Sequence, residues 1–248
     1  AFLSVPAFAQ VKATAPVEPD QAESLPPAER IIERHIQAIG GREAIKSHNS
    51  MRATGEVSIP ASGLKGTVEV LAARPNKVVG RTTIAGIGEV KEGFDGTVGW
   101  SMSPMTGPML ATDEELAQKA FDSDFDGQLG FASKYTSVKT LEKTTFEGRP
   151  VYKVALTPRT GGSDDIRFYD VETGLEAGSI LQRKNPMGTI TVTSAVSEYK
   201  KFGNLLQPTV VKQTMQGITM ITTITSIEFD TVDPAVFELP AEIKALIK

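Results

Sequence analysis

The chain has 248 residues, of which 40% are hydrophobic and 23% charged, and its formal net charge at neutral pH is -4. This length suffices for one large β domain or two small domains with a core that needs no covalent staples. Because cysteine is absent, disulfides, thiolate metal sites, cysteine nucleophiles and a lipid-modified N-terminal cysteine are excluded. The acidic balance argues against a nucleic-acid-binding protein. Only His35 and His48 are available for histidine-based acid–base or metal chemistry.

The N-terminal residues are typical of an export signal. Residues 1–9 are uncharged and mostly apolar, and Ala7, Phe8 and Ala9 match the small-x-small pattern of a cleavage site. We interpret 1–9 as the remnant of a signal peptide, the alternative being an apolar tag. Residues 10–27 are rich in proline and small polar residues and are expected to form a flexible leader. No later segment approaches the roughly 18 apolar residues of a membrane helix, so a soluble, exported protein of the periplasm is expected.

Three helices are predicted. The first begins after the leader, ends at the pair Gly40–Gly41 and places four isoleucines on one face. These are Ile31, Ile32, Ile36 and Ile39. The second helix spans about 113–125 and is opened by Thr112 and Glu115, whose spacing matches a capping box. The third is a short C-terminal helix over 241–247.

Most of the remaining chain alternates apolar and polar residues, as half-buried strands do. Examples are Val68 and Val70, and the tract 189–229, which is broken by turn residues at Gly203–Asn204 and Gly217. We count about ten such segments with short connections, which favours an antiparallel meander. A single curved sheet would leave a concave apolar face that the helices cover only in part, and hence a cavity. Two packed sheets would leave none, and periodicity alone leaves both arrangements open.

A methionine-rich segment supplies the candidate binding residues. It spans 101–110 and directly follows the only tryptophan, and its two prolines and Gly107 are expected to prevent a regular element. Methionine adapts to irregular apolar shapes, so this segment and the helix after it are interpreted as a lid over a pocket, the alternative being that they fill the end of a barrel as core. The expected ligand-binding residues are Trp100, Met102, Met105, Met109, Leu110, Leu116, Phe121 and Phe125.

The catalytic and metal-binding patterns are incomplete. Residues 122–127, with aspartates at alternating positions before a glycine, match the first half of a calcium loop, but Ser133 stands where a bidentate glutamate is needed. We therefore expect a solvated acidic helix end and no metal. His35 is expected to pack in the core and His48 to be solvated in a polar turn. Asp164 and Asp165 are interpreted as part of a hairpin loop, and no nucleophile elbow or phosphate loop is found.

Three short motifs together resemble the LolA-like superfamily, the group of outer-membrane lipoprotein-sorting proteins and periplasmic lipoprotein carriers. They are residues 38–45, Phe94-Asp95-Gly96 leading to Trp100, and Asp233–Pro234 followed by 237–240. The resemblance covers about 30–240. It implies a mainly β domain over 28–248, an antiparallel sheet curved into an unclosed barrel with helices across its mouth and an apolar cavity for acyl chains. It places 102–125 near the lid, with Arg74 or Arg81 as the buried arginine that holds the lid closed.

These observations rank three functions. The first is a non-enzymatic periplasmic carrier or binding protein for a lipid or acylated ligand. It is expected to be a monomer without a cofactor and to have a transport partner in the inner or outer membrane. The second is a sensor module of the same fold that binds a membrane-protein partner, since a fold does not fix its function. A hydrolytic enzyme that uses the acidic loops ranks last, because the motif search offers it no nucleophile or base.

Overall fold

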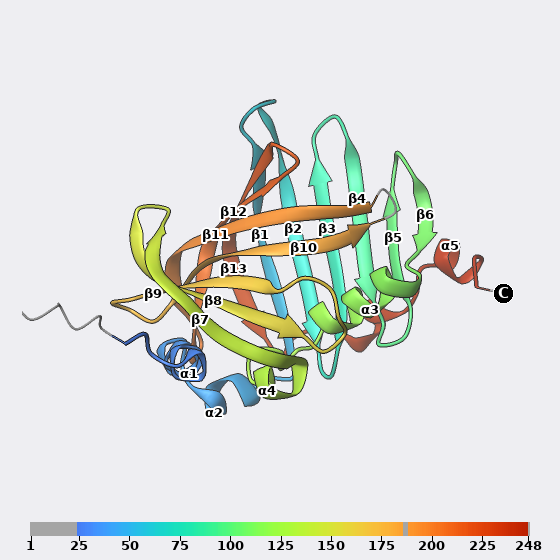
Figure 1. The fold of residues 1–248 in the computed structure, drawn as a ribbon. Helices are drawn as coiled ribbons and strands as arrows, with labels where there is room; N and C mark the ends of the chain where they lie inside the picture. Colours follow the sequence, from blue (N-terminus) through green and yellow to red (C-terminus); the bar gives the residue numbers. More distant parts are fainter. Residues whose placement is uncertain (1–23, 186–187, 248) are drawn as a thin grey trace, which may run out of the picture.

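The computed structural model describes residues 24–185 and 188–247 (Figure 1). The expected signal remnant, 1–9, and the expected leader as far as residue 23 lie outside the described residues. The first half of the chain contributes β1 (Ser50–Ile59), β2 (Leu64–Ala73), β3 (Lys77–Ile84), β4 (Gly88–Phe94), β5 (Gly99–Ser103) and β6 (Gly107–Leu110). The second half contributes β7 (Tyr135–Phe146), β8 (Arg149–Pro158), β9 (Asp165–Asp170), β10 (Glu176–Asn185), β11 (Gly188–Phe202), β12 (Leu205–Met215) and β13 (Ile218–Phe229).

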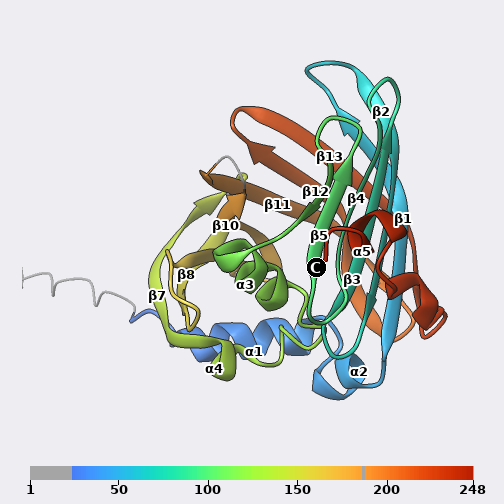
Figure 2. The ribbon, with the colours of Figure 1, turned by 90° about the vertical axis from the view of Figure 1, so that its right-hand side faces the viewer.

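These thirteen strands form one antiparallel sheet, which answers the question that periodicity left open. The order is β6-β5-β4-β3-β2-β1-β13-β12-β11-β10-β9-β8-β7, so two meanders join where β1 pairs with β13. The edge strands β6 and β7 do not pair with one another in the described structure, and the sheet is therefore curved but unclosed. The two halves bend toward each other, with helix α3 between them (Figure 2). An unclosed antiparallel barrel was predicted and is confirmed, whereas a sandwich is not formed.

The sheet has more strands than the ten or so expected, and one reason lies in the methionine-rich segment. Its prolines and Gly107 were expected to prevent regular structure, yet β5 and β6 form a hairpin here, in which Met102 pairs with Pro108. Pro104 lies in the turn, and Gly107 adopts the positive φ of 69° that closes it. Because β6 is an edge strand, the missing N–H group of Pro108 costs no ladder hydrogen bond.

The helices are short and lie at the ends and across the mouth of the sheet. They are α1 (Ala28–Ala38), α2 (Arg42–Lys46), α3 (Asp113–Asp122), α4 (Phe131–Lys134), the 3-10 helix η1 (Pro234–Phe237) and α5 (Ala241–Lys244). The three predicted helices all form, although α3 and α5 end earlier than expected. The predicted capping box does not form, because the Thr112 side chain caps no N–H group. Its backbone carbonyl accepts hydrogen bonds from the N–H groups of Glu115, at 3.0 Å, and Leu116, at 3.3 Å. None of the helices in the described ranges combines the length and apolar character needed to cross a membrane.

The core divides between the two faces of the sheet. On the concave face, the predicted isoleucine face of α1 is buried against β7, β8 and β9, with Ile36 fully buried beside Val154 and Leu156. On the convex face of the first meander, η1 and α5 cover a second cluster that contains Trp100, Phe237 and Ile243. The C-terminal segment thus covers the convex face of the first meander, whereas α1 covers only one end of the concave face.

Candidate ligand-binding site

The segment that joins β6 to β7, residues 111–134, crosses the concave face from one edge of the sheet to the other. Its helix α3 contacts β10 on one side and β5 on the other, as Figure 2 shows. None of the residues of α3 is fully buried. A segment with so little buried apolar area is held mainly by directional polar contacts, which places it at the low end of local stability.

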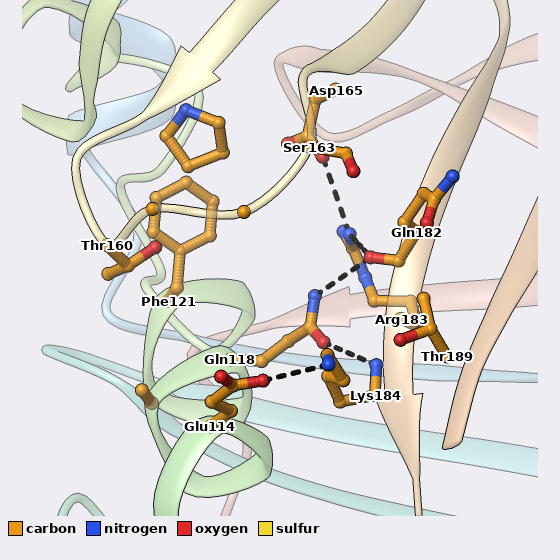
Figure 3. A pocket seen from close by; sticks show the side chains of 14 residues that line it. Glu114, Gln118, Phe121, Thr160, Ser163, Asp165, Gln182, Arg183, Lys184 and Thr189 are labelled. Carbon is orange, nitrogen blue, oxygen red and sulfur yellow. Dashed lines mark hydrogen bonds and ion pairs between the residues drawn. The ribbon is translucent and has the colours of Figure 1, made fainter.

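Polar side chains tie α3 to β10 around a pocket of about 350 Å³ (Figure 3). Glu114 pairs with Lys184 at 3.0 Å. Gln118 accepts a hydrogen bond from the Lys184 backbone N–H at 2.9 Å and donates one to the Gln182 carbonyl at 3.3 Å. On the other side of the helix, Lys119 pairs with Glu92 of β4 at 3.0 Å. Helix α3 is therefore anchored by ion pairs to both halves of the bent sheet.

The loop after α3 is held by Arg74, which lies between β2 and β3. The Arg74 guanidinium pairs with Asp126, donates to the His48 carbonyl at 2.7 Å and lies over the Phe125 ring. Of the two arginines that the resemblance left open, Arg74 is the one that contacts the crossing segment. Arg81 instead pairs with Glu69 of the neighbouring strand at 3.0 Å.

Two further cavities lie on the concave side, and Phe125 lines both. The Met51 cavity has a volume of about 230 Å³. Part of its lining is a row of four side chains that pair across adjacent strands, Phe229, Met51, Ala72 and Val78. The crossing segment and the start of β12 contribute further residues. Its apolar lining consists of Ile45, Met51, Ala72, Val78, Phe125, Leu205 and Phe229. The Arg167 cavity, of about 280 Å³, lies between α1, the crossing segment and β9. Its lining includes His35, Phe121, Asp122, Lys134, Arg167 and Tyr169.

Charged and phenolic groups gather in the Arg167 cavity. The Arg167 guanidinium pairs with Glu176 at 3.4 Å. Burial acts to lower the pKa of Arg167, but the pKa is raised overall, and the negative charge of Glu176 makes the largest contribution to that rise. Burial raises the pKa of Tyr135 to about 12 and that of Tyr169 higher still. Both phenols are therefore neutral donors at physiological pH.

His35 and Lys134 complete the polar lining of this cavity. The His35 ring is 5.4 Å from the Tyr169 ring, and burial lowers the pKa of His35, so the imidazole is neutral. Burial also lowers the pKa of Lys134, whose ammonium donates to the Phe121 carbonyl at 2.6 Å and pairs with Asp124 at 3.4 Å. His35 packs in the core, as the sequence indicated.

The structure brings three of the eight expected ligand-binding residues together over the concave face. Leu116 packs above Gly99, Phe121 meets the Tyr135 ring edge-on at 5.5 Å, and Phe125 separates the two cavities. Met109 is half-buried in β6, opposite Ser101, and so lies on the side of the sheet that α3 covers.

The other four expected residues lie elsewhere. Trp100, Met102 and Leu110 belong to the cluster on the convex face beneath η1 and α5, and Met105 is 86% exposed at the tip of the β5–β6 hairpin. The segment 102–125 is thus not one lid, because 102–110 extends the sheet. The alternation of β5 puts Gly99 under α3 and Trp100 on the opposite face, where its ring covers Gly93 so closely that a Cβ there would be 2.7 Å away.

The acidic motif 122–127 does not assemble as a metal shell. Asp122 pairs with Arg183 at 3.1 Å, Asp124 with Lys134 and Asp126 with Arg74, so the three carboxylates face three different cations. Ser133, in the twelfth position, donates to the Gly130 carbonyl at 2.8 Å. Within the described ranges, no group of three or more metal-ligating side chains could hold an ion.

The remaining polar candidates have structural partners. Asp165 is not in a hairpin loop but begins β9, where it is buried and accepts a hydrogen bond from the Tyr135 hydroxyl at 3.1 Å. Asp164 accepts one from Thr157 at 2.7 Å. His48 was expected to be solvated, but its ring stacks on Phe229 at 4.1 Å and has partners at both nitrogens.

Arg167 and Tyr169 were not found from the sequence. In β9 they alternate with Ile166 and Phe168, and the usual interpretation of such a pattern puts the apolar residues on the concave side. Here Ile166 and Phe168 pack with Phe146 on the convex face, and the polar residues point inward. Phe146 stacks on Phe168 at 4.1 Å. Knowing that Phe146 lies on the convex face would have shown that the apolar residues of β9 lie there too.

Comparison with known proteins identifies the fold. No family model matches the chain, and no curated protein sequence matches it either. Solved structures do match it. A LolA superfamily protein from Nitrosomonas europaea is 12% identical, with a TM-score of 0.57, over 87% of this chain and 99% of that one. A DUF1329 family protein from Desulfovibrio piger is also 12% identical, with a TM-score of 0.57, over 86% and 97%.

A third similar structure is an outer membrane lipoprotein-sorting protein domain from Vibrio parahaemolyticus. It is 14% identical, has a TM-score of 0.51, and the match covers 85% of this chain and 97% of that domain. The chain therefore has a LolA-like fold over nearly the whole length of these structures, as the sequence motifs indicated.

Proposed function

We propose that this protein is a non-enzymatic binding protein that carries a lipid or an acyl chain on the concave side of its sheet, in the bacterial periplasm. The observation that carries the proposal is the row Phe229, Met51, Ala72 and Val78, which lines a cavity beneath a segment held chiefly by ion pairs. Such a segment can move aside without exposing a large core of its own. The apolar row can then accept an alkyl chain.

The energetics favour an alkyl ligand. Each buried methylene contributes about 0.8 kcal/mol, so a chain of roughly fifteen carbons gains about 12 kcal/mol before the costs of association. Each cavity is smaller than the 300 Å³ or so at which ordinary ligand pockets begin. A long acyl chain would therefore occupy the Met51 cavity and pass Phe125, which has to rotate to let it through.

The periplasmic location rests on the expected export signal and on the fold shared with a lipoprotein-sorting domain. The sensor alternative uses the same fold but needs no ligand in these cavities. A lipid-loaded protein would favour the carrier.

The test is direct. The full chain, isolated from the periplasm of its own host, is extracted with organic solvent, and the extract is analysed by mass spectrometry. We expect lipid in the extract of the wild type and much less in that of Phe125→Asp, which puts a charge between the cavities. Leu141→Asp is the matched control, because Leu141 is exposed on β7. A wild-type protein that releases no lipid would contradict the carrier function.

A further inference from the structure

The Arg167 cavity contains buried polar atoms that have no partner among the described residues. They are Nε of Arg167 and Nδ1 of His35. His35 is 7% exposed, and Arg167 lies deep in the molecule, with a side chain that retains 29% of its accessible surface because it lines the cavity. A buried donor without an acceptor is unfavourable, so Nε of Arg167 favours a ligand that brings an acceptor oxygen.

Of these two atoms, Nε of Arg167 is the donor. Nε of Arg167 always carries a proton, and the only ion pair of this guanidinium in the described structure is the long one to Glu176. His35 is neutral, because burial lowers its pKa, and its single ring proton is held by the Gly174 backbone carbonyl, so the unpartnered Nδ1 is an acceptor and not a donor. The hydroxyl of Tyr169, a neutral phenol in the same cavity, is the second donor.

The charge balance selects the kind of acceptor. Lys134 and Arg167 line the cavity together with Asp122 and Asp124, so cations and carboxylates are equal in number. Lys134 is engaged by Asp124, Asp122 by Arg183, and Arg167 by Glu176. A ligand carboxylate would meet two carboxylates and no free cation, whereas a carbonyl oxygen brings no charge that must be desolvated.

The two cavities place this acceptor relative to the alkyl chain. Phe125, Asp122, Asp124 and Gln128 line both of them. Donors therefore lie on one side of Phe125, and the apolar row of the Met51 cavity lies on the other. A molecule whose carbonyl is joined directly to an alkyl chain matches this order.

We propose that Arg167 and Tyr169 form a subsite for the neutral carbonyl of an acyl ester or amide, by which the protein distinguishes acylated ligands from free fatty acids. This subsite rests on the proposed function, because it positions a ligand whose chain the concave side binds. The carbonyl accepts hydrogen bonds from Nε of Arg167 and the hydroxyl of Tyr169, and the chain extends past Phe125.

The test measures the binding of two probes with the same chain, monomyristoylglycerol and myristate, to the full protein by calorimetry above pH 7. We expect the ester to bind about tenfold more tightly than the acid, which corresponds to ~1.4 kcal/mol. Arg167→Lys keeps a cation beside Glu176 but removes Nε, and Tyr169→Phe keeps a ring beside His35 but removes the hydroxyl. Each variant should lose most of the preference for the ester while its affinity for myristate stays within about twofold, a change of ~0.4 kcal/mol.

Arg81→Lys is the matched control, because Arg81 pairs with Glu69 far from the cavity, and it should keep the full preference. Thermal melts of each variant establish that it is folded, and the two variants are independent, so either one alone can test the subsite. Equal binding of the two probes by the wild type, or an unchanged preference in a folded variant, would overturn the subsite and leave the carrier function standing. A wild type that binds neither probe would overturn both.

Discussion

The guanidinium of Arg74 lies 5.2 Å from the centre of the Phe125 ring and pairs with Asp126, the residue that directly follows Phe125. Arg74 also donates to the backbone carbonyls of His48 and Ile45. A single side chain therefore connects the start of β1, the β2–β3 turn and the crossing segment. This contact fixes the ring that separates the two cavities.

Replacing Arg74 by methionine should loosen the crossing segment. The variant keeps most of the volume but leaves Asp126 and two carbonyls without their partner, which costs about 1–3 kcal/mol. We expect a lower free energy of unfolding in urea and faster hydrogen exchange at residues 122–128. Arg81→Met, which removes only a pair with Glu69, should change stability by less than about 0.5 kcal/mol. Equal exchange in both variants would show that Arg74 does not hold the segment.

The only tryptophan reports on the convex face. Trp100 is 3% exposed beneath η1 and α5, so a ligand on the concave side should leave its emission maximum unchanged. Trp100→Ala should cost about 3–5 kcal/mol of stability, as large-to-small changes in a core do, and Trp100→Phe should bind monomyristoylglycerol with wild-type affinity. A shift of the emission maximum on saturation with that probe would place the ligand near β5 and the C-terminal segment instead.

The environments of the two histidines predict opposite dependences of stability on pH. Burial alone would lower the pKa of His48, but the hydrogen bonds to Asp230 and Asn204, at 2.8 and 2.7 Å, outweigh it and raise the pKa above its ordinary value. Its contribution to stability is therefore complete below about pH 6.5 and is lost as the pH rises through the raised pKa of the folded state. Burial lowers the pKa of His35, so its contribution is present above about pH 6.5 and is lost as the pH falls.

His48→Gln should separate these contributions. The variant retains only the effect of His35, so its free energy of unfolding should rise as the pH increases from about 5.5 to 8, while the wild type changes less. The deficit of the variant relative to the wild type should be largest at the acidic end of this range. Urea denaturation at several pH values provides the measurement, and a deficit that is the same at every pH would show that His48 is not bound as a cation.

Calcium should not stabilise the protein, although residues 122–127 match half of a calcium loop. A bound ion would have to displace Arg183, Lys134 and Arg74 from the three aspartates that they pair with. We expect the melting temperature in millimolar calcium to equal that in a chelator, since binding to the folded state alone would raise it. A rise of several degrees would show that the loop binds the ion.

The helices and strands whose ends and buried faces follow from the local sequence pattern could be predicted. The isoleucines of α1 have helical spacing and a clear stop at Gly40 and Gly41, and all four are buried. The turns at Gly203 and Gly217 end strands as expected. The β5–β6 hairpin was missed, because proline excludes a residue from a central strand but not from an edge, and no local signal reveals which strand is the edge.

The polar half of the candidate site could not be predicted, because it depends on contacts between distant segments. Ile166 and Phe168 lie on the convex face because Phe146 and Val151 make that face of the second meander apolar as well. Because side chains alternate along a strand, Arg167 must then face the concave side. In the same way, Trp100 lies on the convex face and Phe121 on the concave side. One continuous lid would have placed both residues over the concave face.

Photochemical labelling with a diazirine-bearing acyl chain tests the central claim most directly, because it reports where an alkyl chain lies. The account predicts that peptides carrying Met51, Val78 and residues 122–128 are labelled, that excess monomyristoylglycerol suppresses the labelling, and that peptides with Trp100 and Phe237 are not labelled. Labelling confined to the convex face around Trp100 and Phe237, or labelling that no lipid suppresses, would contradict it.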